Sequence, residues 1–210
     1  MQLFNKSAIK KTFVHTWYIY PLLVGLVTVI WLWAFNAYHQ PTKHQQLSLF
    51  FSARIKSDSF VNSITKNYDP ENLREVTVSG LLPGSSGYKD KFDASVAQGD
   101  ILILDDGTIE KYKEVLNVLF YSITDEVKTD YFPGTHEYYT YDDGEAVYTY
   151  GILLKRLNEE HYLSKYMVFN ELCDYYVMFT RASVNVGILK SESNRKYDNA
   201  LTFANYLLEL

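Results

Sequence analysis

The sequence predicts an α/β protein in which a single N-terminal transmembrane helix precedes one three-layer α/β domain. An uncharged apolar run occupies residues 17–35, WYIYPLLVGLVTVIWLWAF. Beyond residue 46, apolar β-branched runs and amphipathic stretches alternate in the order strand, helix, strand, helix, strand, which is the order of a parallel sheet covered by helices. The chain has 210 residues. Roughly 165 of them remain after the anchor, which is enough for one ordinary domain.

The apolar run has the length of a membrane span. At about 1.5 Å per residue it covers roughly 28 Å, close to the hydrocarbon thickness of a bilayer. Aromatic side chains, which favour the headgroup layer, mark both of its ends, and Tyr38 adds a further turn. Pro21 falls in the first turn, where its missing N–H costs little. We therefore expect a transmembrane helix over residues 17–38.

A cleaved signal peptide or a buried core helix is the alternative for this run. A signal peptide has an apolar core of only about 7–15 residues, followed by small residues at the cleavage site. The run here is longer, and cleavage after Ala37 would place Phe35 where a small side chain is needed. We expect the helix to remain in the protein as a single-pass anchor.

The flanking charges predict the orientation of the anchor. Residues 1–16 carry Lys6, Lys10 and Lys11 and no acidic residue. Cytoplasmic flanks are rich in Lys and Arg, so we expect a cytoplasmic tail over residues 1–16 and an extracellular domain at the cell membrane. These lysines are three of the 20 basic residues, and all 25 acidic residues follow position 38, which leaves a net charge of −8 outside. A domain this acidic is a poor partner for nucleic acid.

The first half of the domain reads as a parallel βαβαβ unit. Residues 39–46 form a polar tether with an extended reach of at most about 26 Å, and the α/β domain covers residues 47–210. We expect a strand at 47–53, a turn at 54–57, a helix ending at Tyr68, a strand at 73–79, a helix at 88–97 and a strand at 101–104. Ser57 or Asp58 caps the first helix, and Asp69–Pro70 ends it.

The second half adds a hairpin and further helices. Thr108 is expected to cap a helix through Val118, and residues 119–137 are expected to be irregular. Two Tyr-rich strands around residues 142–144 predict a β-hairpin. We then expect a polar connecting helix near 155–166, a buried strand at 174–180, a short extended or helical piece at 183–189, and an amphipathic helix at 198–208.

Several stretches together resemble bacterial extracellular solute-binding proteins. They are LSLFFSA, the GSSGY loop before a helix, QGDILILDDGTI, TYGILL, DYYVMFTRASVNVGIL and the closing DNALTFANYLLEL. The resemblance covers most of residues 47–210. It implies a domain similar to one lobe of a periplasmic-binding-protein fold, in a membrane-anchored relative of ABC transporter binding proteins. A working binding protein closes two lobes around its ligand, whereas the interval between Asp106 and the hairpin is too short for a second lobe.

Polar side chains follow the three predicted parallel strands and form the candidate binding site. Ligands of open parallel sheets lie beyond the carboxyl ends of the strands, so we expect these side chains to converge there. Their hydroxyl and carboxylate groups suit a polyol, a sugar or an amine. They are Ser52 and Ser57 after the first strand, Ser85, Ser86 and Tyr88 after the second, and Asp105 and Asp106 after the third. Ser and Asp at such positions are also typical helix caps, and that interpretation stays open.

Enzymatic, metal and cofactor sites find no support in the sequence. The histidines beyond the anchor lack metal-ligand spacing, DDGTIE and YDDGE lack the Asp ladder of a calcium loop, and PGSSGY lacks the ending of a P-loop. Cys173, the only cysteine, lies among apolar residues, where a thiol is inert. The run Glu159, Glu160 and His161 can be imagined as an acid–base site, but a solvated face of a helix is its commoner role. We expect no cofactor, no metal and no catalysis.

The 19 tyrosines leave two interpretations open. Most of them lie between Tyr112 and Tyr206. They suit a sugar-stacking surface, although half-buried strand positions are the commoner use of Tyr.

These observations favour an extracellular, solute-binding-like accessory component of a transporter or surface complex. Its expected partners are a membrane protein, either a permease or a sister subunit, and a small polar solute. The second hypothesis is a structural or interaction subunit that binds no small molecule. A ligand-sensing ectodomain is the third, although a tail of 16 residues is too short for an output domain.

Overall fold

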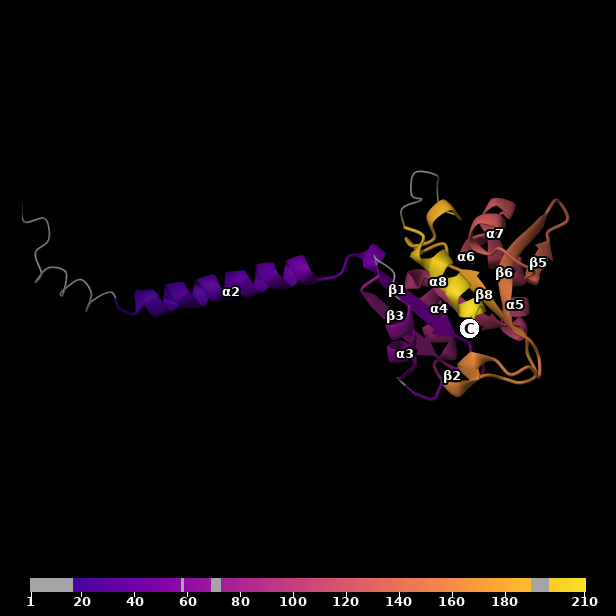
Figure 1. Ribbon diagram of the computed structural model, residues 1–210, viewed down its shortest axis with the longest axis horizontal. Coiled ribbons are helices and arrows are strands. Elements are labelled where there is room, and N and C mark those ends of the chain that lie inside the picture. Colours follow the sequence, from indigo (N-terminus) through magenta and orange to yellow (C-terminus); the bar gives the residue numbers. More distant parts are fainter. Residues whose placement is uncertain (1–16, 58, 69–72, 190–196) are drawn as a thin grey trace, which may run out of the picture. The chain divides into compact units, whose positions relative to one another are not determined.

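The computed structural model describes residues 17–57, 59–68, 73–189 and 197–210, in two units that divide between Gln40 and Pro41 (Figure 1). Each unit is described by itself. The expected cytoplasmic tail, residues 1–16, lies outside the described residues. So do the expected helix break at Asp69–Pro70 and Asp58, one of the two expected caps.

The first unit contains one long apolar helix, α2 (Ile19–His39), of 21 residues. Its mean hydropathy reaches 1.8, and it is long and apolar enough to cross a membrane. The backbone N–H of Gln40 still donates to the carbonyl of Asn36, but the backbone of Gln40 itself is extended. The helix ends there because Pro41 has no N–H with which to continue it.

The second unit is a mixed α/β domain. Its strands are β1 (Gln46–Phe51), β2 (Arg54–Ile55), β3 (Glu75–Gly80), β4 (Ile101–Asp105), β5 (Tyr138–Asp142), β6 (Val147–Lys155), β7 (Met167–Val168) and β8 (Tyr175–Phe179). Its α-helices are α3 (Ser59–Asn67), α4 (Tyr88–Gln98), α5 (Asp106–Lys111), α6 (Leu116–Leu119), α7 (Asp125–Tyr131) and α8 (Asn199–Leu208). Its 3-10 helices are η1 (Lys43–Gln45), η2 (Lys113–Val115), η3 (Tyr162–Lys165) and η4 (Gly187–Leu189).

Six strands form one sheet in the order β3-β1-β4-β8-β6-β5. The expected βαβαβ unit is confirmed, because β1 pairs in parallel with β3 on one side and β4 on the other. The expected hairpin is confirmed by the antiparallel pair β5 and β6. β8 runs antiparallel between β4 and β6, so the sheet is mixed. The chain enters β8 at the carboxyl end of β4, because the carbonyl of Asp174, just before β8, accepts the N–H of Asp106, just after β4. β8 therefore runs in the opposite direction to β4.

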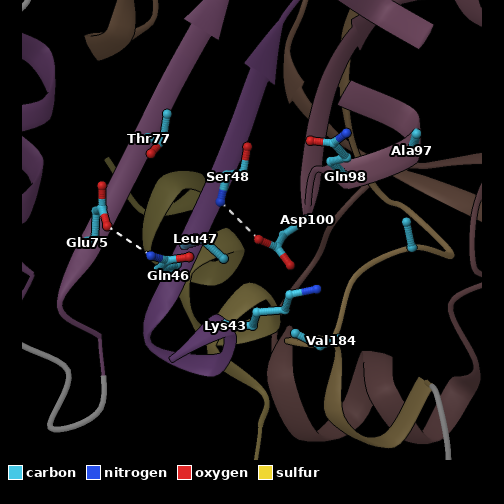
Figure 2. A pocket seen from close by; sticks show the side chains of 11 residues that line it. Lys43, Gln46, Leu47, Ser48, Glu75, Thr77, Ala97, Gln98, Asp100 and Val184 are labelled. Carbon is cyan, nitrogen blue, oxygen red and sulfur yellow. Dashed lines mark hydrogen bonds between the residues drawn. The ribbon is translucent and has the colours of Figure 1, made fainter. Parts of the chain in front are cut away.

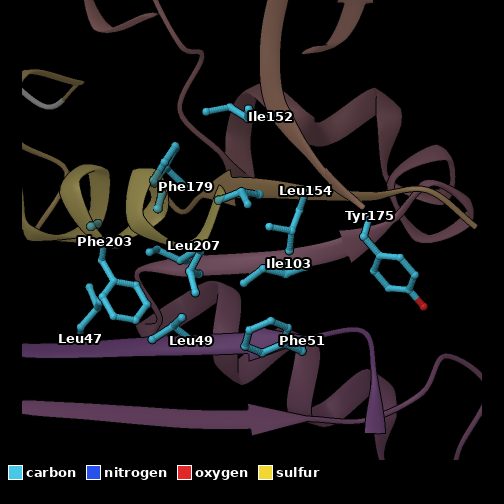
Figure 3. Close-up of a cluster of buried hydrophobic side chains, with 14 of the residues drawn as sticks. Leu47, Leu49, Phe51, Ile103, Ile152, Leu154, Tyr175, Phe179, Phe203 and Leu207 are labelled. Carbon is cyan, nitrogen blue, oxygen red and sulfur yellow. The ribbon is translucent and has the colours of Figure 1, made fainter. Parts of the chain in front are cut away.

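Helices cover both faces of the sheet, which gives three layers. Alternate residues of β4 belong to two separate apolar clusters, with Ile101 and Ile103 in the first and Leu102 and Leu104 in the second. Helices α3, α7 and α8 pack on the first cluster, and α4, α5 and α6 on the second. Figure 3 shows the first cluster, where side chains of β1 face those of α8. Each large side chain buried there contributes about 1.5–3 kcal/mol.

The helix expected from Thr108 through Val118 is broken into α5, η2 and α6, which corrects the prediction. Asp105 is the actual N-cap, because its carboxylate accepts from the N–H of Thr108 and starts the helix at Asp106. The chain then turns at Tyr112. The turn brings Phe120 to a β-bridge with Thr180, and a straight helix would carry the chain away from it.

Three further segments differ from the sequence prediction. The stretch expected to be irregular contains α7, whose N-terminal N–H of Val127 donates to the hydroxyl of Thr124. The expected turn at 54–57 contains β2, which pairs with β7. The expected polar connecting helix is wrong. The chain at residues 156–161 is irregular, and only η3 follows, capped by the imidazole of His161.

Candidate functional site

Parallel strands bring three of the predicted site residues together beyond the carboxyl ends of β1, β3 and β4. Ser52 follows β1, Tyr88 begins α4 after the loop that follows β3, and Asp105 ends β4. The oxygen of the Ser52 side chain lies 2.6 Å from the phenol oxygen of Tyr88. The phenol oxygen lies 3.2 Å from the hydroxyl of Thr108. That hydroxyl donates to the carboxylate of Asp105 at 2.6 Å.

The polar groups in this chain of hydrogen bonds bond to one another within the protein, so the chain is closed. Ser52, Asp105 and Thr108 are all buried, and Tyr88 is half-buried. The second carboxylate oxygen of Asp105 accepts the backbone N–H of Thr108 at 2.8 Å. Burial raises the pKa of the Tyr88 phenol, so it stays protonated at neutral pH and can act as a donor within the chain. The polar groups predicted to meet a ligand therefore already have partners.

Two members of this network are residues that the sequence argument missed. Thr108 was assigned only a capping role, although it links Tyr88 to Asp105. The buried phenol of Tyr175 donates to the carbonyl of Ser52 at 3.3 Å and accepts from the N–H of Asn170 at 2.7 Å. Tyr175 could have been found from its position at the start of a predicted buried strand. A phenol that is buried there needs a hydrogen-bond partner.

The other predicted residues do not join the network. The exposed Ser57 bonds to Ser59, at the start of α3, through both the hydroxyl at 2.6 Å and the N–H at 3.1 Å. The hydroxyl of Ser85 donates to the carbonyl of Leu82 at 2.5 Å, and Ser86 is exposed. Asp106 accepts the N–H of Gly107 at 2.7 Å. Ser57, Ser85 and Asp106 thus make the local turn and cap contacts of the alternative interpretation.

Asp105, Asp106 and Cys173 lie together at this edge, each offering a ligand atom within 4.8 Å of the others. Burial raises the pKa of the Cys173 thiol to about 11, helped by the carboxylates of Asp106 and Asp105. A thiol with this pKa is protonated at neutral pH, whereas a metal ligand is a thiolate. Without a metal ion beside it, this thiol acts as a hydrogen-bond donor to Asp106.

A pocket of about 540 Å³ lies at the opposite edge of the sheet, at the amino ends of β1, β3 and β4 (Figure 2). On one side of it, the amide of Gln46 on β1 donates to the carboxylate of Glu75 on the adjacent strand β3 at 3.1 Å. On the other side, the buried carboxylate of Asp100 accepts the N–H of Ser48 at 2.9 Å and the hydroxyl of Ser183 at 2.5 Å. The sequence argument looked only at carboxyl ends and did not consider this edge.

Burial raises the pKa of Asp100, while its hydrogen bonds oppose the rise. The carboxylate also accepts the amide of Asn185 at 3.1 Å. With three donors around it, Asp100 serves the internal packing of this edge rather than an incoming ligand.

Comparison with known proteins finds no matching family model, no matching curated protein and no matching solved structure. The function is therefore argued from the geometry of the chain itself.

Proposed function

We propose that the protein is a membrane-anchored, non-enzymatic accessory subunit of a transporter or surface complex, with its tail in the cytoplasm and its α/β domain outside the cell. The length and apolar character of α2 support the anchor. The basic residues that precede α2 support the orientation. The connection between α2 and η1, residues 40–42, is short, with a reach of about 10 Å when extended. A short connection favours a partner in the same membrane.

The closed chain of hydrogen bonds from Ser52 through Tyr88 and Thr108 to Asp105 is the observation that carries this proposal. A solute site of the expected kind needs donors and acceptors that are free to meet a ligand. Here they satisfy one another, and a resemblance to one lobe implies that the second wall of any such site would come from another chain. The edge therefore favours docking of a protein over independent capture of a solute.

Exposed leucines lie beside the closed network and support the same conclusion. Leu172 is 76% exposed and Leu157 is 47% exposed. The N–H of Leu157 donates to the side chain of Asp174 at 2.6 Å, and the carbonyl of Asp174 in turn accepts the N–H of Asp106. Both leucines thus adjoin the carboxyl end of β4. Exposed apolar side chains of this kind can form the core of a protein interface, with neighbouring polar groups at its rim.

Site-specific photo-crosslinking in the cells that naturally make the protein tests this function. A photoreactive residue replaces Leu172, and a control replaces Val118, which is 65% exposed on α6, away from this edge. We expect position 172 to crosslink to one integral membrane protein that position 118 does not capture, and Leu172→Asp to abolish co-purification of that protein. Identical products from both positions, or none from position 172, would contradict the proposal.

The second candidate, independent solute binding at the same edge, follows from the resemblance to solute-binding proteins and has its own test. Sugars, polyols and amines are screened for an increase in the melting temperature of the full-length protein in detergent. The screen is repeated on the double variant Ser86→Ala, Asp105→Ala. A ligand at 100 times its Kd stabilises a protein by about 2.7 kcal/mol, which such a screen resolves. An increase that disappears in the double variant would favour the solute-binding function.

A further inference from the structure

A second pocket, of about 340 Å³, lies where β6 ends and β2 pairs with β7. The side chains of Lys155, Met167 and Phe169 contribute to its lining, and Glu159, Glu160 and Glu171 contribute carboxylates. Its volume falls within the range of small-molecule sites. None of the residues predicted from the strand ends lines it. The site proposed below is independent of the docking edge and goes beyond the proposed function.

Lys155 is the unusual member of this pocket, because its side chain is charged and only 4% exposed. Its ammonium donates to the carbonyl of Arg156 at 2.9 Å and lies 5.9 Å from the centre of the Phe169 ring. An ammonium group has three donors. Within the described part of the chain no carboxylate lies within ion-pair distance of it. A buried cation without an anion costs free energy, so an anion bound beside the ammonium of Lys155 would be stabilising.

The neighbouring imidazole of His161 adds a neutral donor rather than a second charge. Its Nδ1 accepts the N–H of Leu163 at 3.2 Å, so the neutral ring carries its proton on Nε2. Burial, followed by the charge of Lys155, lowers the pKa of His161. The positive charge of the pocket therefore comes from two lysines, the buried Lys155 and the exposed Lys56, whose ammonium donates to the carbonyl of Ser164 at 2.8 Å.

The carboxylates of the pocket lie on its exposed rim. Glu159, Glu160 and Glu171 are exposed, and none has a salt bridge among the described residues. The backbone places the two sides of this rim together, because the N–H of Asn158 donates to the carbonyl of Glu171 at 3.0 Å. Asn158 adopts a φ of 57°, a left-handed conformation that Asn tolerates better than most residues. The pocket thus presents the positive charge of Lys155 in its interior, and three carboxylates beside the ammonium of Lys56 at its mouth.

We propose that this pocket binds a free α-amino acid as a zwitterion. The carboxylate of the amino acid meets the ammonium of Lys155, and its own ammonium meets the rim glutamates. Phe169 and Met167 contact the side chain of the ligand. Such a ligand supplies both missing charges at once, with the spacing of a single Cα between them.

Calorimetry on the full-length protein in detergent, with a panel of the common amino acids, tests the proposal. We expect saturable binding of at least one of them. The N-acetyl derivative, which lacks the ammonium, and the matching amine, which lacks the carboxylate, should each bind at least tenfold more weakly. Added salt should weaken the binding because both contacts are ionic.

Two variants and one control make the test decisive. Lys155→Met keeps the volume and apolar stem of the side chain and should abolish binding, whereas Lys111→Met should leave it unchanged. If Lys155→Met fails to fold, the exposed double variant Glu160→Gln, Glu171→Gln decides the question, with an expected tenfold loss of affinity. No binding by any amino acid, or binding that survives both sets of changes, would overturn the proposal. Binding that is lost in Lys155→Met but kept in Ser86→Ala, Asp105→Ala places the ligand in this pocket and not at the strand ends.

Discussion

The side-chain amide of Asn185 donates to the carboxylate of Asp100 at 3.1 Å, and the same nitrogen donates to the carbonyl of Gln46 at 2.8 Å and that of Lys43 at 3.3 Å. One buried side chain thus joins the segment that begins the domain to the start of β4. A second amide, Asn199, donates to the carbonyl of His44 at 2.7 Å. Side-chain hydrogen bonds, as well as apolar packing, therefore connect the first residues of the domain to its C-terminal part.

Replacing Asn185 with Ala should lower the free energy of unfolding of the domain, residues 41–210, by about 1–3 kcal/mol. The change removes one of the three donors to the buried Asp100 and the side-chain donor to the carbonyl of Gln46, and the loss of buried hydrogen bonds costs about that much. Urea denaturation followed by circular dichroism measures the loss. Asn205→Ala removes an amide that bonds only to the exposed Glu209 and should cost less than about 0.5 kcal/mol. Equal losses in the two variants would show that the hydrogen bonds of Asn185 stabilise the domain no more than an exposed amide does.

Asp100 should make the domain less stable as the pH rises. Burial raises the pKa of its carboxyl above the ordinary value of 3.8, against the opposing effect of its hydrogen bonds. The folded state then holds the proton more tightly than the unfolded chain does. This contribution is fully present below pH 3.8 and is lost as the pH rises through the folded pKa.

Denaturation curves of the wild type and of Asp100→Asn across this window check the sign. The advantage of the wild type over the variant should shrink as the pH rises from 3.8. Asp130→Asn, at an exposed acid on α7, serves as the matched control. An advantage that grows with pH would contradict a raised pKa for Asp100.

Removing the phenol oxygen of Tyr88 should destabilise the domain by about 1–2 kcal/mol. Tyr88→Phe leaves the buried hydroxyl of Ser52 without the partner 2.6 Å away and breaks the link to Thr108. Tyr148→Phe, at an exposed ring of β6, should change stability by less than about 0.5 kcal/mol. Thermal denaturation compares the two variants. A Tyr88→Phe domain as stable as the wild type would mean that the strand-end chain of hydrogen bonds does not hold the edge together.

Cys173 should react slowly with maleimides and iodoacetamide at neutral pH. With a pKa of about 11, raised by burial and by the carboxylates of Asp106 and Asp105, only about one thiol in 10⁴ is ionised at pH 7. Asp106→Asn removes one of the carboxylates and should speed alkylation several-fold, with the pH–rate profile displaced to lower pH. Asp130→Asn is the distant control. A wild-type thiol that reacts as fast as free cysteine would contradict a half-buried thiol beside two carboxylates.

Local patterns predicted much of this fold. The uncharged run of α2, the apolar runs of β1 and β4, the β-branched alternation of β3, and the turn residues between β5 and β6 are all local patterns, so they can be read from the sequence. The helix α7 also had a local signal, a Thr124 cap followed by Asp125 and Glu126, but its apolar positions are too few for the periodicity to show. The position of β8 had no such signal, because strand order depends on contacts between residues far apart in the chain.

The candidate site divides in the same way. Convergence of Ser52, Tyr88 and Asp105 follows from parallel topology alone and was predicted. The hydrogen bonds that join them were not predicted, since these depend on the hydroxyl of Thr108 on α5 lying 3.2 Å from the phenol oxygen of Tyr88 on α4. The burial of Lys155 could not be predicted from the sequence either. A lysine at the end of a strand normally reaches solvent, and only the pairing of β2 with β7 and the loop after β6 enclose this one.

Synthesis from the N-terminus makes β4 well before β8, its partner in the finished sheet. During that interval β4 has an open hydrogen-bonding edge, and all five of its residues, buried in the native domain, face water. The ribosome adds the intervening segment at about 5–20 residues per second, so the open edge persists for roughly 4–15 s. Apolar open edges pair readily with strands of other chains. The nascent chain therefore needs shielding over this interval, and products truncated before β8 should aggregate instead of folding.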